Sequence, residues 1–213
     1  MMTQTCPLNY SIIFLCDILI IMNPVKVLKS CIGEEDAQSI IDYMNKNLDS
    51  FDSGPLKLRF IKMFGTDNFN KTISAKVISG LDNIEDQIKS IVDLTTKSIE
   101  DEFQETKGLY LASLWITKQI DGAQIKAHMD TDNGANDHYA YSALLYLSTP
   151  TKSSPLEFPY LKLEIMPELG DLVIFKAGDF GSMHQVKRIG EDRYSIPMWF
   201  TTDKNYELKF AEK

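Results

Sequence analysis

Histidine is scarce in this sequence: the 213 residues contain only three, and His128 and His184 are two of them. Cysteine is equally scarce, and Cys6, Cys16 and Cys31 all lie in the first 31 residues. They are odd in number, have no CxxC spacing and lie far from the histidines, so they form neither a disulfide framework nor a zinc knuckle. We therefore expect a protein of a reducing compartment such as the cytoplasm.

Positive charge is also in short supply. The formal net charge is −8 and the pI is about 4.9. Because phosphate backbones repel an acidic surface, this balance argues against a nucleic-acid partner. Hydrophobic residues make up 44% and charged residues 24%, which is typical of a single globular domain with a full core.

A long hydrophobic run is missing. The apolar stretch from Tyr10 to Met22 is interrupted by Asp17 and is too short to span a bilayer. No Lys or Arg precedes it, so it lacks the basic start of a secretory signal. We expect no membrane association. Our hypothesis is that the native chain starts at Met22 and that residues 1–21 are a non-native extension; the alternative is a short interfacial or disordered tail.

Apolar spacing predicts two amphipathic helices in the first half of the chain. One begins after Gly33 with the acidic turn Glu34, Glu35 and Asp36, which favours the helix dipole, and runs for about four turns. The other covers Leu81 to Phe103 and is expected to pack on a sheet.

After residue 108 short strand patterns follow one another, separated by turn signals. With a first strand at Leu56–Phe64, they are Leu109–Ile116, Gln124–Met129, Tyr139–Leu147, Leu161–Ile165, Leu172–Phe175, Gln185–Arg188 and Tyr194–Phe200. Helices first and many short strands later predict an α+β domain over residues 22–213, with a jelly-roll core and the N-terminal helices packed on one sheet.

The candidate site is the stretch His128-Met129-Asp130. In an extended strand residues two apart point to the same face, so His128 and Asp130 project together. His184 follows about fifty residues and several strands later and can complete two imidazoles and one carboxylate on one face of a metal. Non-haem Fe(II) is held in this way, with positions left open for substrate and oxygen.

Other polar residues near this stretch have several possible roles. Asp132 could compete as a ligand, although its Asp-Asn-Gly context favours a turn cap. His138 is expected in a loop near the substrate. Arg193 and Ser195 share one face of a predicted strand, and an arginine fork can bind a carboxylate at two points. Lys187 and Arg188 are alternatives to Arg193 as carboxylate ligands. Both lie too near His184 in the sequence to reach the far end of a carboxylate co-substrate easily.

Four segments carry a resemblance to a known family: LWITKQIDGAQIKAHMDTD, YSALLYLS, ELGDLVIF and MHQVKRIGEDRYSIPMWF. In this order they resemble the iron- and 2-oxoglutarate-dependent dioxygenases, nearest the prolyl 4-hydroxylase-like branch, over residues 110–202. The resemblance implies a double-stranded β-helix, iron on His128, Asp130 and His184, and the 2-oxoglutarate C5 carboxylate on Arg193 with help from Ser195. It also implies O2 as a substrate and hydroxylation of a peptidyl or small-molecule substrate, with ascorbate as a reductant.

The sequence departs from this family at two points. Ser153-Ser154-Pro155 precede LEFP where relatives often have a Gly-Gly pair, and a tyrosine of the pocket is missing. Many relatives carry a tyrosine that contacts 2-oxoglutarate in the strand before the His-x-Asp stretch, whereas this chain has Thr117-Lys118-Gln119. Tyr146 and Lys118 are the candidates to replace it. Two other functions fit less well: a cupin-like metal or small-molecule binding module without oxygenase activity, and a zinc hydrolase, which needs a general-base Glu beside the ligands.

Overall fold

The computed structural model describes residues 24–53, 59–66, 74–75, 77–104, 108–131 and 136–211. The expectations for residues 1–21, the start at Met22 and the ligand role of Asp132 therefore lie outside the described residues. Within the described part, no helix is long and apolar enough to cross a bilayer.

Two α-helices, five short 3-10 helices and fourteen strands make up the described chain. The helices are α2 (Glu34–Lys46) and α3 (Glu85–Phe103), with η1 (Leu48–Ser50), η2 (Asp82–Ile84), η3 (Pro159–Leu161), η4 (Phe180–Ser182) and η5 (Lys204–Tyr206). The strands are β1 (Val25–Leu28), β2 (Asp52–Ser53), β3 (Arg59–Thr66), β4 (Ser74–Ala75), β5 (Val77–Ile78), β6 (Tyr110–Gln119), β7 (Ile125–His128), β8 (Tyr141–Tyr146), β9 (Leu156–Phe158), β10 (Leu163–Ile165), β11 (Leu172–Lys176), β12 (His184–Val186), β13 (Arg193–Thr201) and β14 (Lys209–Phe210).

Eight strands form the larger sheet, in the order β1-β11-β8-β13-β6-β3-β2 with β4 paired to β3. All its pairs are antiparallel. Alternation along the central strands gives the sheet two different faces. On β13, Ile196, Met198 and Phe200 pack into the main hydrophobic core, whereas Arg193 and Ser195 line a cavity on the opposite face.

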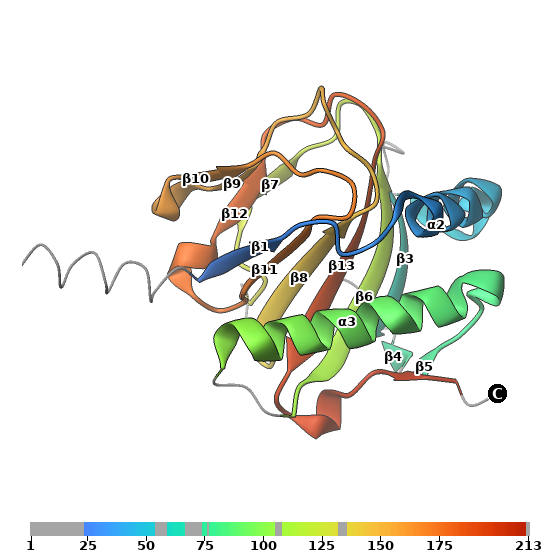
Figure 1. The fold of residues 1–213 in the computed structure, drawn as a ribbon, viewed down its shortest axis with the longest axis horizontal. Coiled ribbons are helices and arrows are strands. Elements are labelled where there is room, and N and C mark those ends of the chain that lie inside the picture. The colour runs from blue at the N-terminus through green and yellow to red at the C-terminus, as the bar shows by residue number, and fades with distance from the viewer. Residues whose placement is uncertain are drawn as a thin grey trace, which may run out of the picture.

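The two helices cover the first of these faces. Figure 1 shows α3 lying across β8, β13 and β6, with α2 beside it near β3. α2 buries Ala37, Ile40 and Met44, and α3 buries Ile88, Ile91 and Ile99, all in the same core as β13. The predicted packing of two amphipathic helices on one sheet is therefore confirmed, and the helical apolar stripes account for it.

The second face packs against a four-stranded antiparallel sheet, ordered β10-β9-β12-β7. Tyr146, Val173 and Phe175 of the larger sheet form one buried cluster with Leu156 and Val186 of the smaller sheet, among others. Two antiparallel sheets therefore enclose a second interior, separate from the core under the helices, and the candidate site lies in it.

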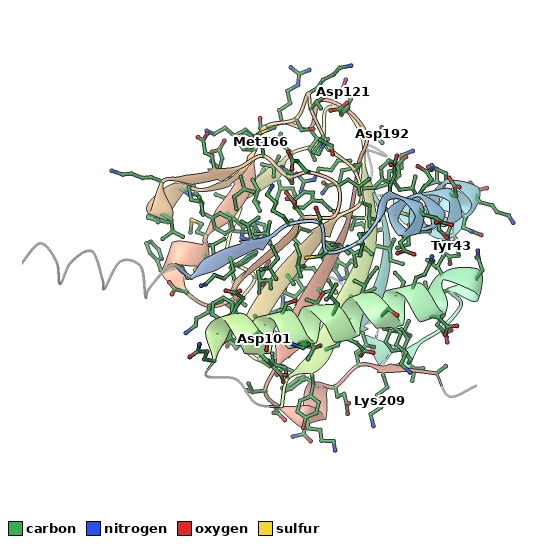
Figure 2. The ribbon with its side chains drawn as sticks, in the orientation of Figure 1. Tyr43, Asp101, Asp121, Met166, Asp192 and Lys209 are labelled. Atoms are coloured by element: carbon green, nitrogen blue, oxygen red, sulfur yellow. The ribbon has the colours of Figure 1, made fainter. Side chains whose placement is uncertain are left out.

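The loops at residues 120–124 and 187–192 join the two sheets at one end. The amide of Gly122 donates to the carbonyl of Ile189, and the amide of Ile189 donates to the carbonyl of Ala123, both at 2.8 Å. Figure 2 places Asp121 and Asp192, one from each loop, at this end of the molecule. Because these loops precede β7 and β13, they fix where the smaller sheet sits on the larger one.

Element boundaries differ modestly from those predicted. α2 ends at Lys46 because η1 takes over at Leu48, and α3 begins at Glu85 after the turn η2. Six strands were not predicted: β1, β2, β4, β5, β9 and β14. β9 is short and lies between Pro155 and Pro159, which are signals of a turn.

Candidate metal centre

Three ligand atoms from separate parts of the chain converge in the space between the sheets. His128 ends β7, Asp130 follows it, and His184 opens β12. Each offers one ligand atom, and these atoms all lie within 4.8 Å of one another, a group that no other His, Cys, Asp or Glu residues form in the described part of the chain. The three ligands predicted from the sequence therefore come together.

Strand pairing brings the two histidines together. His184 and His128 are direct partners in the β12–β7 ladder, and their ring centroids are 4.4 Å apart. A register shift between His184 and Val186 marks an irregularity of the kind that re-aims a side chain at a functional site.

Asp130 reaches the site differently from the prediction. β7 ends at His128, so Asp130 lies in a turn and strand alternation does not explain its direction. Two contacts hold it instead: Ser142 Oγ of β8 donates to Asp130 Oδ2 at 2.5 Å, and Asn136 Nδ2 donates to the Asp130 carbonyl at 3.3 Å. The other carboxylate oxygen, Oδ1, lies 3.4 Å from His128 Nε2.

Hydrogen bonds also set the tautomers of both rings. His128 Nδ1 lies 2.8 Å from the carbonyl of Lys126, and His184 Nδ1 lies 3.0 Å from the carbonyl of Ser182. Because a carbonyl can only accept, each Nδ1 donates a proton, and the lone pair of each neutral ring is on Nε2. This is how metal-binding histidines are usually oriented.

The electrostatics favour the protonation states that bind metals. Burial alone would raise the pKa of Asp130, but at low pH, where the imidazoles are protonated, the charge of His184 and hydrogen bonds from His128 and Ser142 outweigh it and hold the pKa at about 2. Burial is the main cause that lowers the pKa of His184 below 6.5. Asp130 is thus a carboxylate and His184 a neutral imidazole near neutral pH, and both forms are metal ligands. The donor set fits Fe(II).

A cavity of about 390 Å³ extends from these ligands into the interior. At its other wall Arg193 is only 1% exposed, and Nε and Nη1 of its guanidinium have no hydrogen-bond partner in the described structure. Nη2 lies 3.5 Å from Tyr146 Oη, and the guanidinium sits over the Tyr146 ring, 5.0 Å from its centroid. A buried cation without an anion requires a partner, and the cavity offers room for a carboxylate.

Hydroxyl groups lie beside this arginine. Ser195 shares the face of Arg193 on β13, and its Oγ lies 2.8 Å from Thr117 Oγ1 of β6. Thr117 therefore lines the cavity in the region where a tyrosine was expected from the family resemblance. Lys118 points to the other face of the sheet, where Nζ bonds Asn45 Oδ1 at 3.2 Å and pairs with Asp192 at 3.0 Å. Of the two candidate replacements, Tyr146 is thus the one beside Arg193.

The remaining sequence candidates lie away from the cavity or at its rim. Lys187 pairs with Glu157 at 2.8 Å and Arg188 with Asp121 at 3.8 Å, both on the surface. His138 stacks on Tyr206 with a centroid distance of 3.9 Å and contacts Tyr139, which lines the cavity. Ser142 was missed from the sequence because its spacing from Asp130 carries no motif.

Comparison with known proteins agrees with this geometry. Residues 114–201 match the model of the 2OG-Fe(II) oxygenase superfamily, which confirms the resemblance found in the sequence. No curated protein sequence matches the chain.

Several solved structures have a similar fold. The viral collagen prolyl hydroxylase of Paramecium Bursaria Chlorella virus-1, in its 2OG complex, is 14% identical, with a TM-score of 0.63 over 86% of this chain and 98% of that one. A Pseudomonas putida prolyl-4-hydroxylase is 18% identical, with a TM-score of 0.60 over 88% and 96%. A Trichoplax adhaerens prolyl hydroxylase, in complex with a hypoxia inducible factor peptide fragment, is 15% identical, with a TM-score of 0.62 over 93% and 96%.

Proposed function

We propose that this chain, whose residues 114–201 match the 2OG-Fe(II) oxygenase superfamily, hydroxylates a protein side chain or a small molecule with Fe(II), 2-oxoglutarate and O2, and releases succinate and CO2. One observation carries the proposal: a buried arginine without an anionic partner lines the same cavity as a three-ligand metal cluster. A metal-binding module that takes no dicarboxylate would gain nothing from that arginine, whose burial costs stability.

Each residue then has a defined task. His128, Asp130 and His184 hold the metal by Nε2, a carboxylate oxygen and Nε2, and the carbonyls of Lys126 and Ser182 keep the two rings in that orientation. When bound, Fe(II) supplies the oxidative chemistry that joins decarboxylation of 2-oxoglutarate to hydroxylation of the substrate.

Arg193 anchors the distal carboxylate of 2-oxoglutarate. Its unpaired nitrogens, Nε and Nη1, lie on different edges of the guanidinium, and either one together with Nη2 can bind the carboxylate at two points. Tyr146 Oη and Ser195 Oγ are the hydroxyl groups beside the guanidinium that can donate to the same group. Tyr146 therefore takes the part that the family resemblance gave to a tyrosine of the preceding strand.

The proposal extends to the whole domain. Two facing antiparallel sheets, with His128 and His184 in one and Arg193 in the other, support a double-stranded β-helix, or jelly roll, within one domain over residues 22–213. Cys31 forms no disulfide within the described part of the chain, and this supports a reducing compartment such as the cytoplasm.

The test measures succinate formed from 2-oxoglutarate by purified protein with Fe(II) and ascorbate, together with thermal shifts with Mn(II) and 2-oxoglutarate. We expect slow turnover without a substrate, and its loss in His128→Ala and Asp130→Ala. Lys187→Ala is the control, because Lys187 lies on the surface three residues from His184, and it should keep full turnover.

Two outcomes contradict the proposal. Turnover retained in both ligand variants refutes the metal assignment. A shift with metal alone and none on adding 2-oxoglutarate favours the cupin-like binding module.

A further inference from the structure

His138 is the one histidine of the chain that does not belong to the metal cluster. Its ring lies nearly parallel to the ring of Tyr206, with centroids 3.9 Å apart and an angle of 12° between the planes. It also meets the ring of Tyr139 edge to face, with centroids 4.6 Å apart. The half-buried imidazole therefore joins a ring that lines the cavity to a ring that is 41% exposed at the surface.

The loop that carries His138 begins at a metal ligand. It joins Asp130 to β8, and residues 136–140 of it are described. Asn136 Nδ2 donates to the Asp130 carbonyl at 3.3 Å, and the Asn136 carbonyl accepts from the amide of Tyr139 at 2.9 Å. Asn136 and Tyr139 both line the cavity. The position of this loop therefore affects a metal ligand and the cavity wall together.

Tyr206 comes from a segment that is fixed on both sides of it. Before it, the side chain of Asp203 caps η5 by accepting from the amide of Asn205 at 2.9 Å. After it, the amide of Leu208 donates to the carbonyl of Leu111 of β6 at 2.7 Å, and β14 then pairs with β5. Figure 1 shows this segment in red, running from the end of β13 toward β5. The loop of His138 thus leans on a ring whose own backbone is held.

Core packing does not account for this ring. The hydrophobic clusters of the described residues do not include Tyr206. A stacked aromatic pair can favour one conformation over another about twofold to tenfold. A loop that leaves its place for part of the time weakens ligand binding by the fraction of time lost. The stack is therefore strong enough to change the affinity of the metal centre measurably.

We propose that Tyr206 is a positioning residue of the metal centre: by stacking on His138 it holds residues 136–140, and through them Asp130, in the conformation that binds metal. The inference deepens the proposed function, because it concerns the metal site on which that function rests. It also gives a task to residues beyond 114–201, the part of the chain that matches the family model.

The test measures the Kd for Mn(II) by electron paramagnetic resonance of the free ion. Tyr206→Ala and His138→Ala should each weaken Mn(II) binding about twofold to tenfold, because the loop is then in place for part of the time. The double variant should bind no more weakly than either single one, since both changes remove the same contact. Tyr206→Phe and His138→Phe keep a stacked ring and should bind Mn(II) like the wild type.

Phe210→Ala is the matched control. Phe210 belongs to the same segment, four residues after Tyr206, but packs against the main hydrophobic core. This substitution should lower the Tm of the metal-free protein and leave the Kd for Mn(II) unchanged. Equal losses of Mn(II) affinity in Phe210→Ala and Tyr206→Ala would show that general loosening of the segment sets the affinity, and would overturn the proposal.

The remaining outcomes separate this inference from the proposed function. Unchanged Mn(II) affinity in both alanine variants overturns the positioning role, as does a double variant in which the two losses multiply. The proposed function then stands if the wild type shows a thermal shift with Mn(II) and 2-oxoglutarate. The expected series of Mn(II) affinities, with no further shift when 2-oxoglutarate is added to the wild type, overturns the proposed function and leaves the positioning role standing.

Discussion

Arg193 is a charged side chain buried between two sheets. It is 1% exposed, and within the described part of the chain its nearest polar contact is the Tyr146 hydroxyl at 3.5 Å. The ring of Tyr146 offers a weak attraction to the cation, which compensates only part of the lost hydration. The free protein therefore keeps a strained electrostatic state that a bound carboxylate relieves.

Replacing this arginine should separate stability from function. We expect Arg193→Met to raise the stability of the ligand-free protein by on the order of 1 kcal/mol, because a lone buried charge is removed. The same variant should lose the thermal shift caused by 2-oxoglutarate while keeping the shift caused by Mn(II). Differential scanning calorimetry measures both; a lower Tm of the ligand-free variant would contradict this account.

Acid should destabilise the metal-free protein through one buried imidazole, His184, and one half-buried imidazole, His138. Burial lowers the pKa of His184 and of His138 in the folded state, so below about pH 6.5 the unfolded chain binds more protons than the folded one. Stability contributed by the neutral rings is complete above that pH and is lost as the pH falls. The Tm should drop between about pH 7 and about pH 5, and the double variant His138→Asn/His184→Asn should flatten the profile. A Tm that rises on acidification would refute this.

Among the contacts between elements, Gly170 joins the turn before β11 to the linker between β1 and α2. Its φ is +83°, its carbonyl accepts from the amide of Cys31 at 2.8 Å, and a Cβ there would lie 2.7 Å from the carbonyl oxygen of Ile32. This turn leads into β11 and holds the linker between β1 and α2.

Gly170→Ala should therefore be costly. A positive φ and a backbone clash together predict a loss of about 2–4 kcal/mol, measured by chemical unfolding. Gly33→Ser is the control, because nothing lies within 4 Å of a Cβ at Gly33 and serine is a good N-cap for α2. It should be neutral or slightly stabilising; equal losses in both variants would contradict the geometric explanation.

Part of the fold and of the metal site could be predicted from the sequence, and part depends on tertiary contacts. The α2 and α3 stripes and the central strands follow from apolar periodicity, and the His-x-Asp and His pattern identifies three ligands that converge. The direction of Asp130 could not be predicted, because a hydrogen bond from Ser142 and a turn determine it. Tyr146 could be suspected from the sequence, but only tertiary packing places it against Arg193.

At the scale of the whole molecule, the site depends on how one sheet sits on the other. His128 and His184 belong to the four-stranded sheet, and Arg193 belongs to the eight-stranded sheet. The main-chain hydrogen bonds of Gly122 and Ile189 join the loops between these sheets. The spacing between metal and anchor is therefore a property of the fold and not of any single loop.

That spacing limits the length of a co-substrate that can reach both the metal ligands and Arg193. A 2-oxo diacid must reach from the metal ligands to the guanidinium, so one methylene more or less leaves one end unmatched. 2-Oxoadipate and oxaloacetate should therefore be decarboxylated with kcat/KM at least about tenfold below that of 2-oxoglutarate. Equal rates for the three acids would mean that the gap between the sheets adjusts to its contents. If the distance between the metal ligands and Arg193 is fixed, the stacking of the two β-sheets determines which 2-oxo acid the protein accepts.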